Sequence, residues 1–262
     1  MSASRFFHAL GAVAGLFMLA GCAPKTMPTQ GAAVNLAPTD EARALLLLQA
    51  KAGDKFKQLE LGEKLDAENQ PDEAAKWYQL AAQQGLAEAQ FRFADMLASG
   101  EGTPKQPDEA AKWFRRAALQ DHPKAQFNLA MLHANGEGVP QSESDASQWL
   151  RKSAAAGFDE AQYVLAGRLL RGTSIKELAE AALWLEHAAK QNHREAQYYL
   201  GDLLARGRGV KVDRVQAYKW FSLAAAAGHT EAGRTKPLLA RLMSQEEIAE
   251  AQKLSQDFKP GP

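Results

Sequence analysis

A near-copy of one segment, 36 residues further along the chain, constrains the fold more than any other feature. DEAAKWYQLAAQQGLAEAQ begins at Asp72, and DEAAKWFRRAALQDHPKAQ begins at Asp108. A fixed period of this size predicts stacked repeats, because one short supersecondary unit cannot bury its apolar face alone. All five tryptophans share the register, at spacings of 36, 36, 35 and 36 residues: Trp77, Trp113, Trp149, Trp184 and Trp220.

Small residues recur around each tryptophan at helical spacing. An alanine lies three positions before it, and a pair of small residues lies four and five positions after it. In the first copy Ala74, Ala81 and Ala82 share one side of a helix with Trp77. We therefore predict a helix whose alanines let a neighbouring helix come close, while the indole ring fills the gap between successive helix pairs.

The segment that follows each tryptophan-bearing helix predicts another helix, for example at residues 87–99. Its inward stripe is Ala89, Phe93, Ala94 and Leu97, and such helices stop at a glycine. The residue eight places after each tryptophan is Gly, Asp or Asn, three types that tolerate a left-handed backbone. Left-handed caps that end the tryptophan-bearing helices are therefore expected at Gly85, Asp121, Gly157, Asn192 and Gly228.

The ends of the array are less regular, as terminal repeats should be. Residues 39–56 align on the tryptophan-bearing helix with Leu45 in the tryptophan position, and they predict an N-terminal cap. The repeat array is predicted over residues 57–243, and its pattern is expected to end at Pro237, which lacks a backbone donor. A capping box from Ser244 to Glu247 predicts a last helix, at about 245–257, within a closing segment 244–262.

The first 21 residues have the build of a signal peptide, with Arg5 followed by a short apolar run. The run ends in Leu-Ala-Gly before Cys22, the chain's only cysteine, and this resembles the bacterial lipobox. The resemblance implies acylation of Cys22, for example by palmitate, and Ala23 after it implies sorting to the outer membrane, facing the periplasm. An ordinary signal peptide with an unrelated cysteine is the alternative. Residues 22–38 then predict a lipidated, flexible tether.

The chain offers little that suggests chemistry. Its formal net charge is zero, which disfavours nucleic-acid binding. No serine is followed three residues later by lysine, and the histidines stand one per repeat at His122, His193 and His229 instead of clustering. We predict no catalytic residues, no metal and no cofactor.

The repeating unit resembles the Sel-one-like repeat, a relative of the tetratricopeptide repeat. The resemblance rests on A-Q-x-x-L-A/G, on G-x-G-V and on A-x-x-W-Y/F/L-x-x-A-A-x-x-G, and it covers about residues 57–233. It implies an all-α solenoid of about five helix pairs, used mostly for protein–protein contacts. The sequence departs from the family pattern in three places. The first repeat lacks the Gly-x-Gly loop, the third has Gly172-Thr173-Ser174 in place of that loop, and His133 stands where the family usually has tyrosine.

By the same resemblance, the helices without tryptophan line a concave binding face. Arg168 is a charged residue at a position where the other repeats have the apolar residues Met96, Leu132 and Leu203. It is either an interface anchor or an arginine that snorkels over the core edge. The candidate partner-binding residues are Arg92, Asp95, Asn128, Met131, Arg168, Tyr199 and Asp202.

The leading hypothesis is a lipid-anchored periplasmic adaptor that binds protein partners of envelope assembly, secretion, or polysaccharide or cell-wall machinery. The alternatives are a β-lactamase-like or peptidoglycan-binding protein, and a secreted factor that recognises a host protein. A disulfide-rich branch of the family is linked to β-lactam hydrolysis, but this chain lacks its cysteine pairs.

Overall fold

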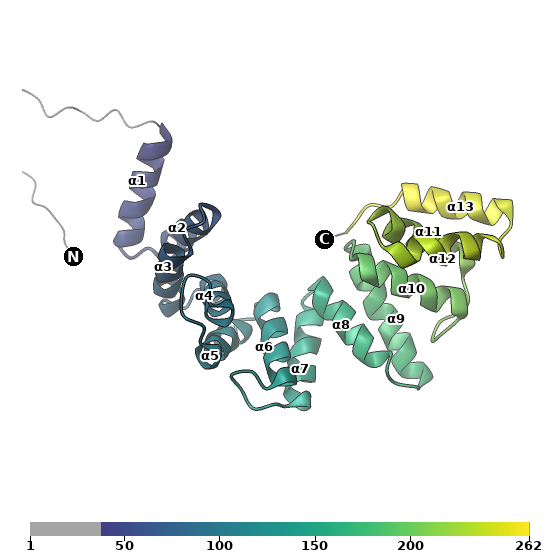
Figure 1. Cartoon of the computed structure of the whole chain (residues 1–262), viewed down its shortest axis with the longest axis horizontal. Coiled ribbons are helices and arrows are strands. Elements are labelled where there is room, and N and C mark those ends of the chain that lie inside the picture. The colour runs from purple at the N-terminus through teal and green to yellow at the C-terminus, as the bar shows by residue number, and fades with distance from the viewer. Residues whose placement is uncertain (1–37, 262) are drawn as a thin grey trace, which may run out of the picture. The chain divides into compact units, whose positions relative to one another are not determined.

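The computed structural model describes residues 38–261, which fold into α-helices with no strand among them (Figure 1). The predicted signal peptide and Cys22 lie outside the described residues, as does the tether up to residue 37. The helices are α1 Pro38–Lys51, α2 Lys55–Ala67, α3 Pro71–Gln83, α4 Ala87–Ser99, α5 Pro107–Ala118, α6 Pro123–Asn135, α7 Glu143–Ala155, α8 Asp159–Leu169, α9 Ile175–Lys190, α10 Arg194–Arg206, α11 Arg214–Ala226, α12 Thr230–Ala240 and α13 Gln245–Gln256.

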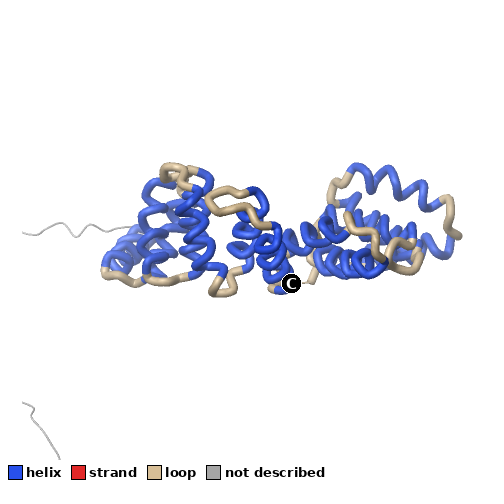
Figure 2. Tube along the Cα trace, turned by 90° about the horizontal axis from the view of Figure 1, so that it is seen from below, coloured by secondary structure: helices blue, strands red, loops and turns tan. Residues whose placement is uncertain are grey.

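Successive helices pack as antiparallel pairs, each made of a first helix and a tryptophan-bearing second helix. The pairs are α2–α3, α4–α5, α6–α7, α8–α9 and α10–α11, and each second helix also packs on the first helix of the next pair (Figure 2). Contacts therefore run mainly between neighbours in sequence, as in repeat proteins. The predicted all-α solenoid of five helix pairs is confirmed.

The second helices end as the substitution pattern predicts. Asp121 and Asn192 have φ angles of +59° and +71°, and the equivalent Gly85, Gly157 and Gly228 also have positive φ. The left-handed residue lets its backbone N–H bond to a carbonyl in the last turn, as Asp121 does to Ala118. The expected caps are thus present in all five repeats.

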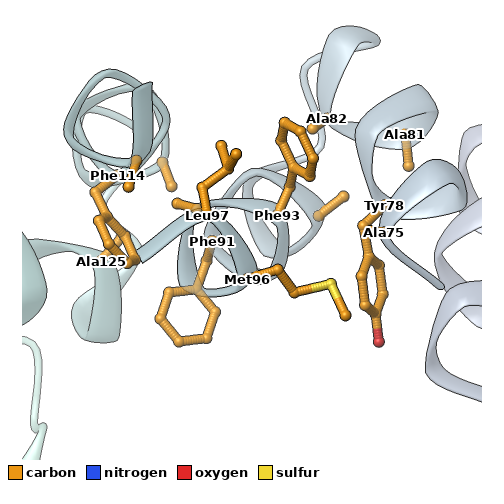
Figure 3. Packing of buried hydrophobic residues seen from close by; sticks show 14 of the residues in the cluster. Ala75, Tyr78, Ala81, Ala82, Phe91, Phe93, Met96, Leu97, Phe114 and Ala125 are labelled. Carbon is orange, nitrogen blue, oxygen red and sulfur yellow. The ribbon is translucent and has the colours of Figure 1, made fainter. Parts of the chain in front are cut away.

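The centre of each repeat is occupied by the residue that follows the tryptophan. Tyr78 and Phe114 are 1% exposed, and their equivalents Leu150, Leu185 and Phe221 are fully buried. Figure 3 shows Tyr78 and Phe114 pointing from their second helices into the core around α4, where Phe91 and Phe93 leave the helix on different sides. This residue packs against the first helix of its own pair, as Tyr78 does against Gly62 of α2 and Phe221 against Gly201 of α10. The interior of each pair is therefore filled by the residue after the tryptophan, a position that the sequence prediction did not single out.

Four of the five tryptophans lie half-buried at the core's edge. Trp149 packs against the cluster of α1–α6 and also against the cluster around Leu150 and Leu165. Trp184 likewise joins that second cluster to the next one. The rings therefore link neighbouring repeats from their margin, and only Trp220 is buried, at 4% exposed.

A buried glutamine fastens each first helix to the second helix before it. Its amide nitrogen donates to the alanine carbonyl eight residues earlier, at 3.1–3.2 Å. In three repeats its oxygen accepts from a glutamine at the end of the next second helix, as Gln58 accepts from Gln84 at 2.8 Å. The buried residues are Gln58, Gln90, Gln126, Gln162 and Gln197.

We call this series of hydrogen-bonded glutamines the glutamine ladder. The hydrogen bond from a second glutamine is missing in two of the five repeats. The position of the donor glutamine is occupied by Ala156 after Gln126 and by Ala227 after Gln197. The buried side-chain oxygens of Gln126 and Gln197 have no hydrogen-bond partner among residues 38–261. A buried acceptor without a partner costs free energy because it has lost its water.

We expect Ala156→Gln to raise the free energy of unfolding by about 0.5–1.5 kcal/mol, because it supplies the missing donor to Gln126. Urea unfolding followed by circular dichroism measures the change. The matched control is Gln191→Ala, which removes the existing donor to Gln162 and should lower stability. Equal stability of Ala156→Gln and the parent chain would contradict this account of the ladder.

The two ends of the array close it differently. In α1, Leu46 and Ala50 are buried, and Leu45, aligned with the tryptophans, is 55% exposed. Pro237, where the repeat pattern was expected to end, lies inside helix α12. Helix α13 has the predicted capping box at Ser244, and it packs on α11 with Ala251 fully buried.

Candidate protein-interaction surface

Aromatic rings meet at four of the five junctions between a second helix and the next first helix. His122 and His193 stand just before α6 and α10, and each ring stacks at 4.7 Å on an aromatic residue of the preceding first helix, Phe91 and Tyr163 respectively. The same position holds His229 stacked on Tyr198 and Phe158 edge-on to Phe127. These four junctions therefore have one aromatic pair each, and the junction before α4 has Leu86 at the same position.

Both ring nitrogens of His122 and of His193 take part in hydrogen bonds. Nδ1 of His122 accepts from the N–H of Ala125 at 3.2 Å, so the side chain caps α6. Nε2 lies 2.9 Å from a carboxylate oxygen of Glu88 and is left as the donor. His193 repeats the arrangement with Ala196 and Glu160. Both nitrogens of each ring are thus used in hydrogen bonds that cap a helix and join two repeats.

The hydrogen bond from His122 changes the acidity of Glu88. It is the main cause that lowers the pKa of Glu88 to about 2, aided by Arg92 and opposed by partial burial of the carboxylate. Since the folded pKa lies below the ordinary 4.5, the unfolded chain takes up this proton first as the pH falls. The stabilisation is thus complete above about pH 4.5 and is lost as the pH falls towards 2.

We expect Glu88→Gln to flatten the fall in unfolding free energy between pH 4.5 and pH 2. Urea titrations at several pH values across this window measure the slope. Glu101→Gln, in an exposed loop, should leave the slope unchanged. A slope that stays the same in Glu88→Gln would show that the bond to His122 does not hold this carboxylate in its charged form.

The seven predicted partner-binding residues fall on one recurring face of the first helices. Their positions can be counted from the alanine of the Ala-Gln pair in each first helix, which is Ala89, Ala125, Ala161 or Ala196. Three of the residues lie three places after this alanine, three lie six places after it, and Arg168 lies seven places after it. All seven lie within the described residues, and no hydrogen bond or ion pair joins any two of them. In order of position they are Arg92, Asn128 and Tyr199, then Asp95, Met131 and Asp202, then Arg168.

Several of these side chains already have partners within the chain. Arg92 bonds to Glu88 at 2.7 Å, and Asp202 bonds to Arg206 at 2.6 Å. Met131 packs against the buried cluster around Leu150. Tyr199 is 40% exposed, with its ring 6.0 Å from that of Tyr163.

Arg168 lies beside a hollow on this face. A cavity of about 420 Å³ is lined by Arg168, Arg171, Tyr163, Val164, Gly167 and Glu143. Gly167 stands where other repeats have Asp95, Met131 and Asp202, and a Cβ there would meet nothing within 4 Å. The missing side chain leaves the space open.

The charges at this cavity favour an acidic partner group. Arg168 donates to Glu143, whose side chain is 74% exposed, while Arg171 forms no ion pair with any described residue. Two arginines against one glutamate leave one positive charge, and a guanidinium can bind a carboxylate through two parallel hydrogen bonds. Arg171 and Tyr163 were not among the predicted residues, although the altered loop at Gly172 marked this repeat as unusual.

Within residues 38–261 no cluster of metal-ligating side chains is present, and none of the helices there is long and apolar enough to cross a membrane. These findings concern the described part of the chain alone.

Comparison with known proteins places the chain in a family. The family model described as "Sel1 repeat" matches five consecutive times, over residues 59–86, 87–122, 123–158, 159–193 and 194–229. No curated protein matches the chain.

Two solved structures are similar over most of the chain. A Sel1 repeat protein from Oxalobacter formigenes is 32% identical with a TM-score of 0.71, over 78% of this chain and 60% of that protein. A protective antigen of uropathogenic Escherichia coli with an SLR fold is 26% identical with a TM-score of 0.55, over 83% and 56%. The match thus spans less than two thirds of either relative. Five matched repeats, covering more than half of its residues, show that the chain belongs to the Sel1 repeat family, whose repeats mediate protein–protein interactions.

Proposed function

We propose that this protein is a lipid-anchored scaffold of the bacterial cell envelope, and that the first-helix face around Arg168 binds an acidic segment of a protein partner. The cavity of Arg168 and Arg171 carries the proposal, because it joins open volume, an unpaired guanidinium and the exposed ring of Tyr199 nearby on one face. Exposed aromatic and arginine side chains of this kind often dominate binding energy. The family's repeats are generally scaffolds without catalysis, which agrees with this role.

The envelope location rests on the sequence before the described residues. A signal-peptide-like segment that ends at Cys22 supports lipid attachment, and Ala23 supports sorting to the outer membrane with the repeats in the periplasm. Several acyl chains on one cysteine would hold the protein at the membrane effectively without release. The adaptor would then present its repeats to secretion, polysaccharide-export or cell-wall machinery.

Capture from crosslinked envelopes tests the binding face. The full chain should retrieve a reproducible protein partner, and Arg168→Ala combined with Tyr199→Ala should abolish the retrieval. Arg115→Ala, an exposed arginine on a second helix, is the matched control and should retain the partner. Retrieval that is undiminished in the double variant would refute a binding face at Arg168.

Fractionation tests the anchor separately. The full chain should stay with membranes after washing at high salt, and Cys22→Ala should release it into the soluble fraction. A parent chain that is already soluble would instead support an ordinary signal peptide and exclude the lipid anchor.

A further inference from the structure

The C-terminal tail of the chain, residues 257–261, lies against the second helices α9 and α11. After α13 the chain continues to the end marked C in Figure 1. The ring of Phe258 meets that of Trp220 edge-on, at 5.5 Å and 74°. The N–H of Gly261 donates to the carbonyl of Lys190, the last residue of α9, at 3.0 Å. This contact explains why Trp220 is the buried tryptophan while its four equivalents are half-buried.

The tail also shields a basic side chain. The Lys219 ammonium lies 4.2 Å from the ring centre of Trp220 and 5.4 Å from that of Phe258. Burial between these groups, together with nearby Lys190, lowers the pKa of Lys219, against the effect of Glu186. The tail therefore removes water from the groove between α9 and α11 in the manner of a bound peptide.

The chain has a second groove of the same construction, 107 residues earlier, between α3 and α5. It encloses about 640 Å³, whereas the groove beside the tail retains about 270 Å³. Matching residues line the two grooves: Ala75 and Ala182, Phe93 and Leu200, Leu97 and Leu204, Thr103 and Val210, Trp113 and Trp220.

The groups that hold the tail have counterparts in the α3–α5 groove. The carbonyl of Gln83, equivalent to that of Lys190, receives no hydrogen bond from the described residues. Arg116 covers a face of Trp113 at 4.2 Å, as Lys219 covers a face of Trp220. Phe93 meets Trp113 edge-on at 5.7 Å and 77°, so an incoming ring would pack against this aromatic pair. Within the described residues, no segment of the chain lies in this groove as the tail lies in the other.

The difference between the grooves indicates the charge of the occupant. The α3–α5 groove is lined by the charged residues Asp72, Lys76 and Glu109, which leave one negative charge. The groove beside the tail is lined by Glu186, Lys190 and Lys219, which leave one positive charge. A basic residue beside the aromatic anchor, as Lys259 follows Phe258 in the tail, would therefore gain attraction there.

We propose that the α3–α5 groove binds an extended segment of a partner protein in which an aromatic residue is followed by a basic one. The aromatic side chain packs against Trp113 and Phe93, and a main-chain N–H beyond it donates to Gln83. The groove is lined by α3 and α5 and by Phe93 and Leu97 of α4, and it shares no residue with the cavity around Arg168. This site therefore goes beyond the binding face proposed above and does not depend on it.

Binding of a labelled peptide tests the site. The probe is the fluorescein-labelled segment 255–262, SQDFKPGP, titrated against the full chain in detergent and followed by fluorescence polarisation. The chain's own tail is held at high effective concentration beside α9 and α11, so the added peptide should occupy the open groove. We expect saturable binding that weakens about tenfold or more when the peptide phenylalanine is replaced by alanine.

Two tryptophan substitutions on α3 locate the binding. Gln79→Trp places a large ring in the groove from an exposed position and should weaken binding about tenfold or more. Leu80→Trp, at the next and also exposed position outside the groove lining, should bind the peptide like the parent. No saturable binding, or equal binding by both variants, would overturn the proposal. Self-association that disappears in Phe258→Ala would also overturn it, because the occupant would then be a second copy.

Discussion

Replacing Phe114 with alanine should destabilise the chain by about 3–5 kcal/mol, because its ring is 1% exposed and alanine would leave a cavity in the core. Replacing the preceding Trp113 should cost less, about 1–2 kcal/mol, although tryptophan is the larger residue. Trp113 is half-buried, so part of its lost surface faces water in any case. Urea unfolding of both variants measures the difference.

This neighbouring pair separates two accounts of the repeat. If tryptophan formed the core, Trp113→Ala would be the more damaging change. Equal or greater loss in Trp113→Ala than in Phe114→Ala would therefore contradict the position of Phe114 at the centre of the repeat. The order should also hold for Tyr78 against Trp77, because each repeat has the same plan.

Gly138→Ala should cost about 2–5 kcal/mol, because it meets both backbone strain and a steric clash. Gly138 has a φ of +66°, and a Cβ there would lie within 2.5 Å of the carbonyl carbon of Pro107 at the start of α5. The second glycine of the Gly-x-Gly loop is thus required where the loop passes over the preceding second helix.

Gly157→Ala is the matched control for the strain alone. Gly157 has a φ of +92°, yet a Cβ there would meet nothing within 4 Å. Its replacement should cost only the about 1–2 kcal/mol of a left-handed alanine. Urea midpoints for the two variants give the comparison, and equal losses would show that the loop does not press against Pro107.

The periodic part of the fold could be predicted from the sequence because the chain contains five copies of one repeat, which can be compared position by position. Gly85, Asp121 and Asn192 share only a tolerance of positive φ, so comparing them revealed a backbone angle. The helix pairing, the caps and α13 could all be predicted in this way. Helix α12 could not, because the cost of Pro237 did not show that the surrounding helix would continue.

What the sequence left unassigned depends on contacts between repeats. The Ala-Gln pair was recognised as recurrent, but the role of Gln58 and its equivalents requires knowing which carbonyl lies opposite each amide. Tryptophan was expected between helix pairs because it is large and recurs at a fixed interval. The sequence did not show that the next residue is the one buried inside each pair, because one step along a helix turns a side chain by about 100°. Arg168 was found because its equivalents in the other repeats are apolar. Arg171 has the polar equivalents Ser99, Asn135 and Arg206, so its position did not mark it as an exception.

The central claim is that the indole rings lie at the edge of the core, while the residue after each tryptophan is buried inside the repeat. The solvent accessibility of each tryptophan tests this claim most directly. Five variants, each keeping one tryptophan and replacing the others with phenylalanine, can be titrated with acrylamide while fluorescence is recorded. The account predicts measurable quenching of Trp77, Trp113, Trp149 and Trp184, and protection of Trp220 that is lost in Phe258→Ala. Protection of all five rings alike, or ready quenching of Trp220 with the tail intact, would contradict it.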